Sequence, residues 1–149
     1  MTSYVKVDLR RLVEMRANGV CEYCLIHESD TYVGCQVEHI IAEKHGGRTE
    51  ASNLAFACAF CNRAKGTDLG TILLPARALT RFFNPRTDLW TEHFLLEGAS
   101  IQPRTLIGEA TVKILRLNAA ARLFERQTLQ LIERYPAPEA FEILNKSLG

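Results

Sequence analysis

Two pairs of cysteines constrain the folding of this chain more than any other feature. Each pair has the CxxC spacing, and the two pairs are Cys21–Cys24 and Cys58–Cys61. A CxxC turn directs both sulfur atoms toward one point, so two such turns can supply four thiolates to a tetrahedral zinc ion. The sequence therefore predicts a structural Zn²⁺ site, which would contribute folding free energy that a small core lacks.

Other uses of paired cysteines are a redox CxxC motif, an iron–sulfur cluster and buried free thiols. A redox motif is expected beside a βαβ pattern, which the sequence does not show. Five cysteines are an odd number and make a poor disulfide framework. In a reducing compartment such pairs are more often metal ligands. The fifth, Cys35, lies in an apolar stretch, so we expect a small buried hydrophobic residue rather than a fifth ligand.

Length and composition limit the class of protein. A chain of 149 residues fits one domain with a modest appendage. No run reaches the roughly 18 apolar residues of a transmembrane helix, and residues 1–8 lack a signal-peptide pattern, so we expect a cytoplasmic protein with no membrane partner. The net charge of +1 argues against a uniformly basic nucleic-acid binder, although basic residues outnumber acidic ones in the middle of the chain.

Local patterns predict an α+β fold with helices and strands in a definite order. Helical spacing and an Asn18–Gly19 stop predict a helix over 6–18. Residues 31–41 are typical of a strand, 54–58 of a short strand or a turn and 42–53 of a loop, and a helix is expected from about Cys61 to Gly66. Further along we expect a hairpin turning at Glu97–Gly98, helices over 107–117 and 123–132 with a break near Asn118, and a final short helix. We place a zinc-bearing core at 1–68 and an extension of hairpin and helices at 69–149, packed as one unit.

The polar residues between and after the cysteines resemble those of a known family. The ordered set is Glu38-His39, Gly46-Gly47, Asn53 and then Cys58-x-x-Cys61-Asn62-x-x-Lys65-Gly66. Together with Cys21-x-x-Cys24 it resembles the HNH endonuclease motif in its zinc-stapled form. The resemblance implies a ββα-metal finger, also called a His-Me finger, that cleaves phosphodiester bonds of nucleic acids. It also accounts for the long gap between the cysteine pairs, which must accommodate the catalytic loop.

The resemblance implies a role for each polar residue. His39 would be the general base that activates water, as suits an imidazole near neutral pH. Asn53 would orient the loop that carries His39. Glu38 and Asn62 would hold a catalytic Mg²⁺ or Mn²⁺, since carboxylate and amide oxygens suit hard ions. Without the family, the Glu38–His39 pair would be interpreted as a strand end satisfied by local hydrogen bonds.

Three further residues are candidate nucleic-acid contacts: His45, Arg63 and Lys65. His45 has the alternatives of a third metal ligand or a solvated loop residue. Lys65 has the alternative of a lysine placed against the C-terminal end of a helix dipole.

The sequence favours a metal-dependent endonuclease acting on DNA, and nothing in it excludes RNA. The alternative function is a non-catalytic zinc module that binds nucleic acid or a partner protein. The apolar residues of the extension, including Phe82, Phe83 and Trp90, are either core or the face of a homodimer.

Overall fold

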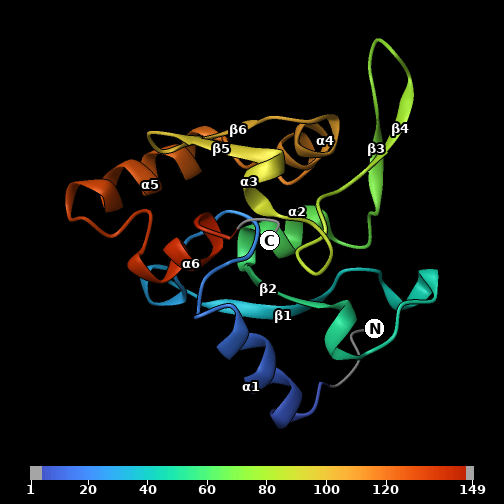
Figure 1. Cartoon of the computed structure of the whole chain (residues 1–149), viewed down its shortest axis with the longest axis horizontal. Helices are drawn as coiled ribbons and strands as arrows, with labels where there is room; N and C mark the ends of the chain where they lie inside the picture. The colour runs from blue at the N-terminus through green and yellow to red at the C-terminus, as the bar shows by residue number, and fades with distance from the viewer. Residues whose placement is uncertain (1–4, 147–149) are drawn as a thin grey trace.

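The computed structural model describes residues 5–146 and consists of short helices and three two-stranded antiparallel sheets. Part of the N-terminal stretch used for the signal-peptide expectation, residues 1–4, lies outside the described residues. The mixture of helices and small sheets confirms the α+β class (Figure 1). Among residues 5–146 no helix is both long and apolar enough to cross a membrane.

The first helix ends where the sequence predicts. Helix α1 spans Val7–Arg16 with Ala17 as its C-cap. Asn18 and Gly19 then adopt φ values of 53° and 71°, which reverse the chain in the left-handed region. The turn delivers the chain directly to the first cysteine pair.

A central hairpin carries the polar motif. Strands β1 (Cys35–His39) and β2 (Leu54–Cys58) pair so that Cys35 faces Cys58 and His39 faces Leu54. Helix α2 (Ala59–Lys65) follows β2 without a loop. Helices α1 and α2 lie on opposite sides of this hairpin (Figure 1). Two antiparallel strands followed by a helix are the ββα arrangement expected from the sequence.

Two boundaries differ from the expectations, for local reasons. Strand β1 begins at Cys35 rather than Thr31, because Gly34 turns the chain with φ +73° just before the strand. Helix α2 begins two residues before Cys61, because the Cys58 sulfur caps the helix by accepting the Cys61 N–H. Between β1 and β2, the expected loop contains two single 3₁₀ turns, Glu43–His45 and Ala51–Asn53.

The extension forms an arm and a helical cover. Strands β3 (Gly70–Leu73) and β4 (Ala78–Arg81) form an arm that projects from the body (Figure 1). The hairpin expected to turn at Glu97–Gly98 is confirmed between two short strands, and a helical turn precedes it. The remaining elements are α3 (Trp90–His93), β5 (Phe94–Glu97), β6 (Ser100–Pro103), α4 (Leu106–Ile114), α5 (Ala120–Leu131) and α6 (Phe141–Leu144).

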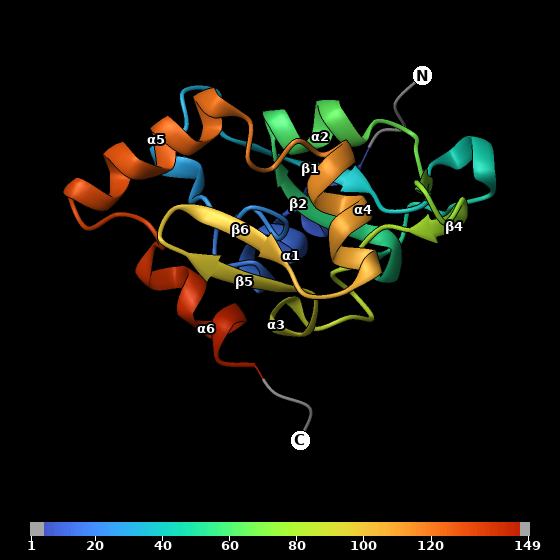
Figure 2. The same ribbon diagram turned by 90° about the horizontal axis from the view of Figure 1, so that it is seen from above.

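The extension covers the side of the central hairpin that carries α2, as the view from above shows (Figure 2). One hydrophobic cluster joins the two parts, and it contains cysteines of both pairs with aromatic residues of the extension. Phe82, Phe83 and Trp90 are buried in it, with 5%, 3% and 3% of their surface exposed. These three residues are therefore core and do not themselves offer a face to a partner.

Candidate metal centre and active-site cleft

The four paired cysteines meet at one point inside the molecule. One ligand atom from each of Cys21, Cys24, Cys58 and Cys61 lies within 4.8 Å of the others. The sulfurs of Cys24 and Cys58 are 3.7 Å apart. Zinc bound tetrahedrally at about 2.3 Å from each thiolate requires sulfurs roughly 3.8 Å apart. The cluster therefore has the dimensions of a tetrathiolate zinc site, and it suggests zinc binding.

Each CxxC turn is folded as a metal-binding knuckle. The N–H of Cys24 donates to the Cys21 sulfur at 3.5 Å, and the N–H of Cys61 donates to the Cys58 sulfur at 3.4 Å. Leu25, directly after the first pair, adopts a left-handed φ of +67° and donates its N–H to the Cys21 carbonyl. A leucine accepts this strained conformation only where its surroundings enforce it.

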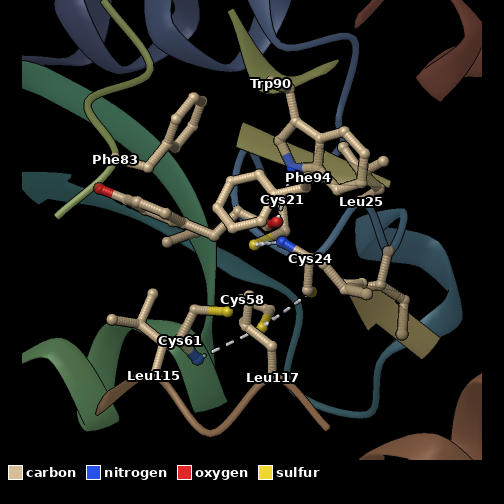
Figure 3. Packing of buried hydrophobic residues seen from close by; sticks show 14 of the residues in the cluster. Cys21, Cys24, Leu25, Cys58, Cys61, Phe83, Trp90, Phe94, Leu115 and Leu117 are labelled. Atoms are coloured by element: carbon tan, nitrogen blue, oxygen red, sulfur yellow. Dashed lines mark hydrogen bonds between the residues drawn. The ribbon is translucent and has the colours of Figure 1, made fainter. Parts of the chain in front are cut away.

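All four sulfurs lie in an apolar shell that includes Phe94, Leu115 and Leu117 (Figure 3). Burial raises the pKa of the Cys21 and Cys61 thiols well above their ordinary value. Hydrogen bonds from the other three sulfurs, first of all Cys21, lower the pKa of Cys24 instead. Cys35 is half-buried and stands apart from the four-sulfur cluster.

A separate cleft brings together three residues of the polar motif. Glu38, His39 and Asn62 line a cleft of about 380 Å³, between the end of β1, the first 3₁₀ turn and α2. Strand geometry explains part of this arrangement. Residues two apart in a strand face the same side, so Gln36 and Glu38 both face α2.

Glu38 is already engaged on both carboxylate oxygens. The Tyr23 hydroxyl donates to Oε1 at 2.5 Å, and the Lys65 ammonium lies 3.2 Å from Oε2. Burial raises the pKa of Glu38, while the positive charge of Lys65 acts in the opposite direction. A carboxylate has about four lone-pair sites, so both oxygens still have acceptor capacity toward the cleft.

Asn62 is oriented by a neighbour on β1. Its Nδ2 donates to Oε1 of Gln36 at 2.6 Å. This bond holds the amide nitrogen against the strand, and Oδ1 accepts no hydrogen bond from residues 5–146. The amide therefore presents an oxygen, which is the atom that a hard cation binds.

The His39 ring is held through Nε2. This nitrogen lies 2.8 Å from the Thr49 hydroxyl and 3.6 Å from Oε1 of Glu43. A carboxylate beside Nε2 favours the tautomer with its proton there. In that tautomer Nδ1 carries a lone pair and can accept a proton.

Asn53 closes the loop between β1 and β2. Its Oδ1 accepts from the Ile41 N–H, and its Nδ2 donates to the carbonyls of Ile41 and Arg48, each at 2.9 Å. Gly47 packs so tightly here that a Cβ would lie 1.7 Å from the Ile41 oxygen and 2.8 Å from Asn53 Nδ2. Asn53 is therefore bonded to the segment that directly follows His39.

The three candidate contacts lie in different environments. Arg63 is exposed on α2. His45 is largely exposed, and its Nε2 lies 3.1 Å from the Thr67 carbonyl. Lys65 has 2% of its surface exposed and binds Glu38 and the carbonyls of His39 and Ile40. The Lys65 ammonium therefore faces the end of β1 rather than solvent, and its charge stabilises that end of the strand.

Sequence reasoning missed several supporting residues, and only some of them leave a sequence signal. Gln36 could have been found, because it precedes Glu38 by two residues and shares its strand face. Glu43 could also have been found, four residues after His39. Tyr23 and Thr49 carry no such signal, because their partners are set by the tertiary fold.

Comparison with known proteins supports the same family. Residues 21–68 match the family model described as HNH endonuclease. The matched segment begins at the first ligand cysteine and includes the whole cleft motif from Glu38 to Lys65. No curated protein and no solved structure matches the chain. The match confirms the resemblance noted in the sequence, and the four-cysteine cluster agrees with its zinc-stapled form.

Proposed function

We propose that this protein is a metal-dependent HNH endonuclease that hydrolyses phosphodiester bonds in DNA. The observation that carries the proposal is the cleft lined by Glu38, His39 and Asn62 within the segment that matches the HNH model. RNA shares the phosphodiester backbone and is the second substrate to test.

In this proposal Glu38 and the free Oδ1 of Asn62 hold a divalent cation, Mg²⁺ or Mn²⁺. Both side chains offer hard oxygen donors to one cleft. Such an ion, when bound, polarises the scissile phosphate and stabilises the leaving oxygen.

His39 accepts the proton of the attacking water at Nδ1. Its contacts with Thr49 and Glu43 hold the ring and keep the proton on Nε2. Asn53 fixes the backbone after His39, and Lys65 fixes the His39 carbonyl, so the imidazole is positioned before substrate arrives. His45 and Arg63 are the proposed contacts to the phosphates that flank the cut site.

The test is nicking of supercoiled plasmid by the zinc-loaded full chain with Mg²⁺ or Mn²⁺. We expect His39→Ala to lower the rate by about 10²- to 10⁴-fold, the usual contribution of a general base. His27→Ala is the matched control, because His27 follows the first knuckle and bonds Ser29 instead. Equal nicking by wild type and His39→Ala, both with zinc bound, would remove His39 from the mechanism.

A second candidate function is a non-catalytic zinc module that binds nucleic acid or a protein partner. The observation that favours it is the engagement of both Glu38 carboxylate oxygens by Lys65 and Tyr23, which compete with a cation for this side chain. Titration with Mn²⁺, followed by electron paramagnetic resonance, separates the two functions. The nuclease predicts binding that Glu38→Gln weakens; the module predicts no difference and no cleavage of DNA or RNA.

A further inference from the structure

The strongest unexplained feature is a buried arginine at the cysteine cluster, contributed by a distant helix. Nη2 of Arg122, in α5, donates to the Cys61 sulfur at 3.0 Å and lies 3.7 Å from the Cys58 sulfur. Only 7% of its surface is exposed. Phe60, between the two cysteines of the second pair, covers the guanidinium with its ring centroid at 5.6 Å.

A buried guanidinium requires a counterion, because an unpaired charge inside a protein is costly. Arg122 takes part in none of the carboxylate ion pairs found among residues 5–146. Its other nitrogen donates to the carbonyls of Leu115 and Arg116, which are neutral dipoles. The sulfurs of Cys58 and Cys61 are therefore the groups in direct contact with the guanidinium that become anionic when they bind zinc, whereas the Glu125 carboxylate interacts with Arg122 without forming a direct ion pair.

Charge counting supports the same conclusion from the side of the metal. A zinc ion with four thiolates carries a double negative charge, which an apolar shell solvates poorly. One guanidinium in contact with the sulfurs halves that charge. The Arg122 guanidinium thus donates hydrogen bonds to two sets of acceptors, the thiolates and the carbonyls that directly follow α4.

We propose that Arg122 is an electrostatic partner of the zinc–thiolate centre, so that α5 of the extension completes a metal site whose ligands all lie in the matched segment. The proposal rests on zinc binding by the four cysteines and is independent of nuclease activity. Its consequence is that residues 21–68 hold zinc tightly only with α5 in place.

The test compares Arg122→Met with Arg126→Met in the full chain. Arg126 is the matched control, because it is a buried arginine one turn further along α5 that bonds the Ala99 carbonyl and Asn118. We expect Arg122→Met to weaken zinc binding by about 10- to 100-fold in a chelator competition, as is usual for residues that support metal ligands. Arg126→Met should lower the unfolding midpoint but leave zinc affinity nearly unchanged.

Two spectroscopic and chemical readouts distinguish a charge effect from a packing effect. With Co²⁺ in place of zinc, loss of Arg122 should shift the sulfur-to-metal charge-transfer band to lower energy, because thiolates without a hydrogen bond donate electrons more readily. In the zinc-loaded protein the same change should accelerate alkylation of Cys61 by iodoacetamide, because a metal-bound thiolate that loses a hydrogen bond is a stronger nucleophile. Wild-type zinc affinity, band position and alkylation rate in Arg122→Met would overturn the proposal.

A second pair of variants keeps the proposal testable where Arg122→Met does not fold. Arg122→Lys retains the positive charge, whereas Arg122→Gln retains N–H donors without charge. We expect Arg122→Lys to bind zinc more tightly than Arg122→Gln. Equal affinities in the two variants would show that the charge is irrelevant and would likewise overturn the proposal.

Discussion

The Lys65 ammonium lies 3.2 Å from Oε2 of Glu38, with 2% and 4% of the two side chains exposed. This buried pair joins the last turn of α2 to the end of β1, and the same ammonium binds the carbonyls of His39 and Ile40. One lysine therefore binds two successive carbonyls and so fixes the backbone directly after the His39 side chain.

Replacing Lys65 by methionine should destabilise the protein strongly. The change leaves the Glu38 carboxylate buried without its cation, which typically costs about 3–5 kcal/mol. Urea unfolding of the zinc-loaded protein, without added Mg²⁺, measures this loss. The double variant Lys65→Met/Glu38→Gln removes both charges and should recover part of the stability. A single-variant loss below about 1 kcal/mol, the value of an exposed pair, would contradict the burial seen here.

Asn53→Ala should loosen the loop between β1 and β2. The change removes three hydrogen bonds and leaves the Ile41 N–H without its partner, a loss of about 2–4 kcal/mol in total. Hydrogen exchange of the Ile41 amide should accelerate more than exchange in α5. Ser52→Ala is the control, because Ser52 is an exposed neighbour whose hydroxyl donates to Glu50. Unchanged Ile41 protection in Asn53→Ala would show that the loop is held by other contacts.

Thr49→Val should alter the His39 tautomer. The valine has a similar shape but cannot accept from Nε2, so the proton is no longer held on that nitrogen. Nitrogen NMR shifts of the ring should change, and under the proposed function kcat should fall by about tenfold, a fraction of the usual effect of a general base. Thr49→Ser should restore both values. A valine variant with unchanged ring shifts would mean that Glu43 alone sets the tautomer.

A carboxylate outside the cleft provides a pH prediction with a definite sign. Burial alone would raise the pKa of Asp88, but hydrogen bonds from Arg81 and from the Asn84 N–H lower it below its ordinary value. A carboxylate whose pKa is lower in the folded state stabilises the protein at pH values above its unfolded-state pKa. This stability is lost as the pH falls through the folded-state pKa. Asp88→Asn should therefore cost about 1 kcal/mol or less at pH 7 and nothing in acid. Urea unfolding at several pH values tests this, and equal costs at all pH values would exclude the ionic origin.

Removal of zinc should unfold the core rather than only inactivate it. The single tryptophan, Trp90, reports this change, because its indole N–H donates to the Tyr23 carbonyl inside the first cysteine pair at 2.9 Å. A strong chelator should shift Trp90 emission to longer wavelength, and added zinc should reverse the shift. Unchanged emission with zinc fully removed would show that the fold does not depend on the metal.

Much of this architecture could be predicted from local sequence because the informative residues are close together. The CxxC spacing predicts two knuckles, and β1, β2 and α2 follow from short-range patterns between them. Cys58 shows the limit of such reasoning. Its sulfur caps α2 because the knuckle brings it to the Cys61 N–H. The helix therefore begins two residues earlier than the sequence predicts.

The supporting contacts could not be predicted because they join residues far apart in the chain. Tyr135 donates its hydroxyl to the Cys24 carbonyl across 111 positions, and Trp90 reaches Tyr23 across 67. Neither aromatic residue differs in sequence from an ordinary core residue. The engagement of Glu38 by Lys65 was missed for another reason, since a lysine near a helix end is usually assigned to solvent.

The position of Arg122 has a consequence for biosynthesis. The ribosome releases the four cysteines well before this arginine, which follows Cys61 by 61 positions. A nascent chain that captures zinc early must carry the full negative charge of the thiolates until α5 emerges. Under the proposed role of Arg122, metal retention improves only after α5 has been made and has packed on the core, and a chain truncated before Arg122 should lose its zinc to cellular chelators.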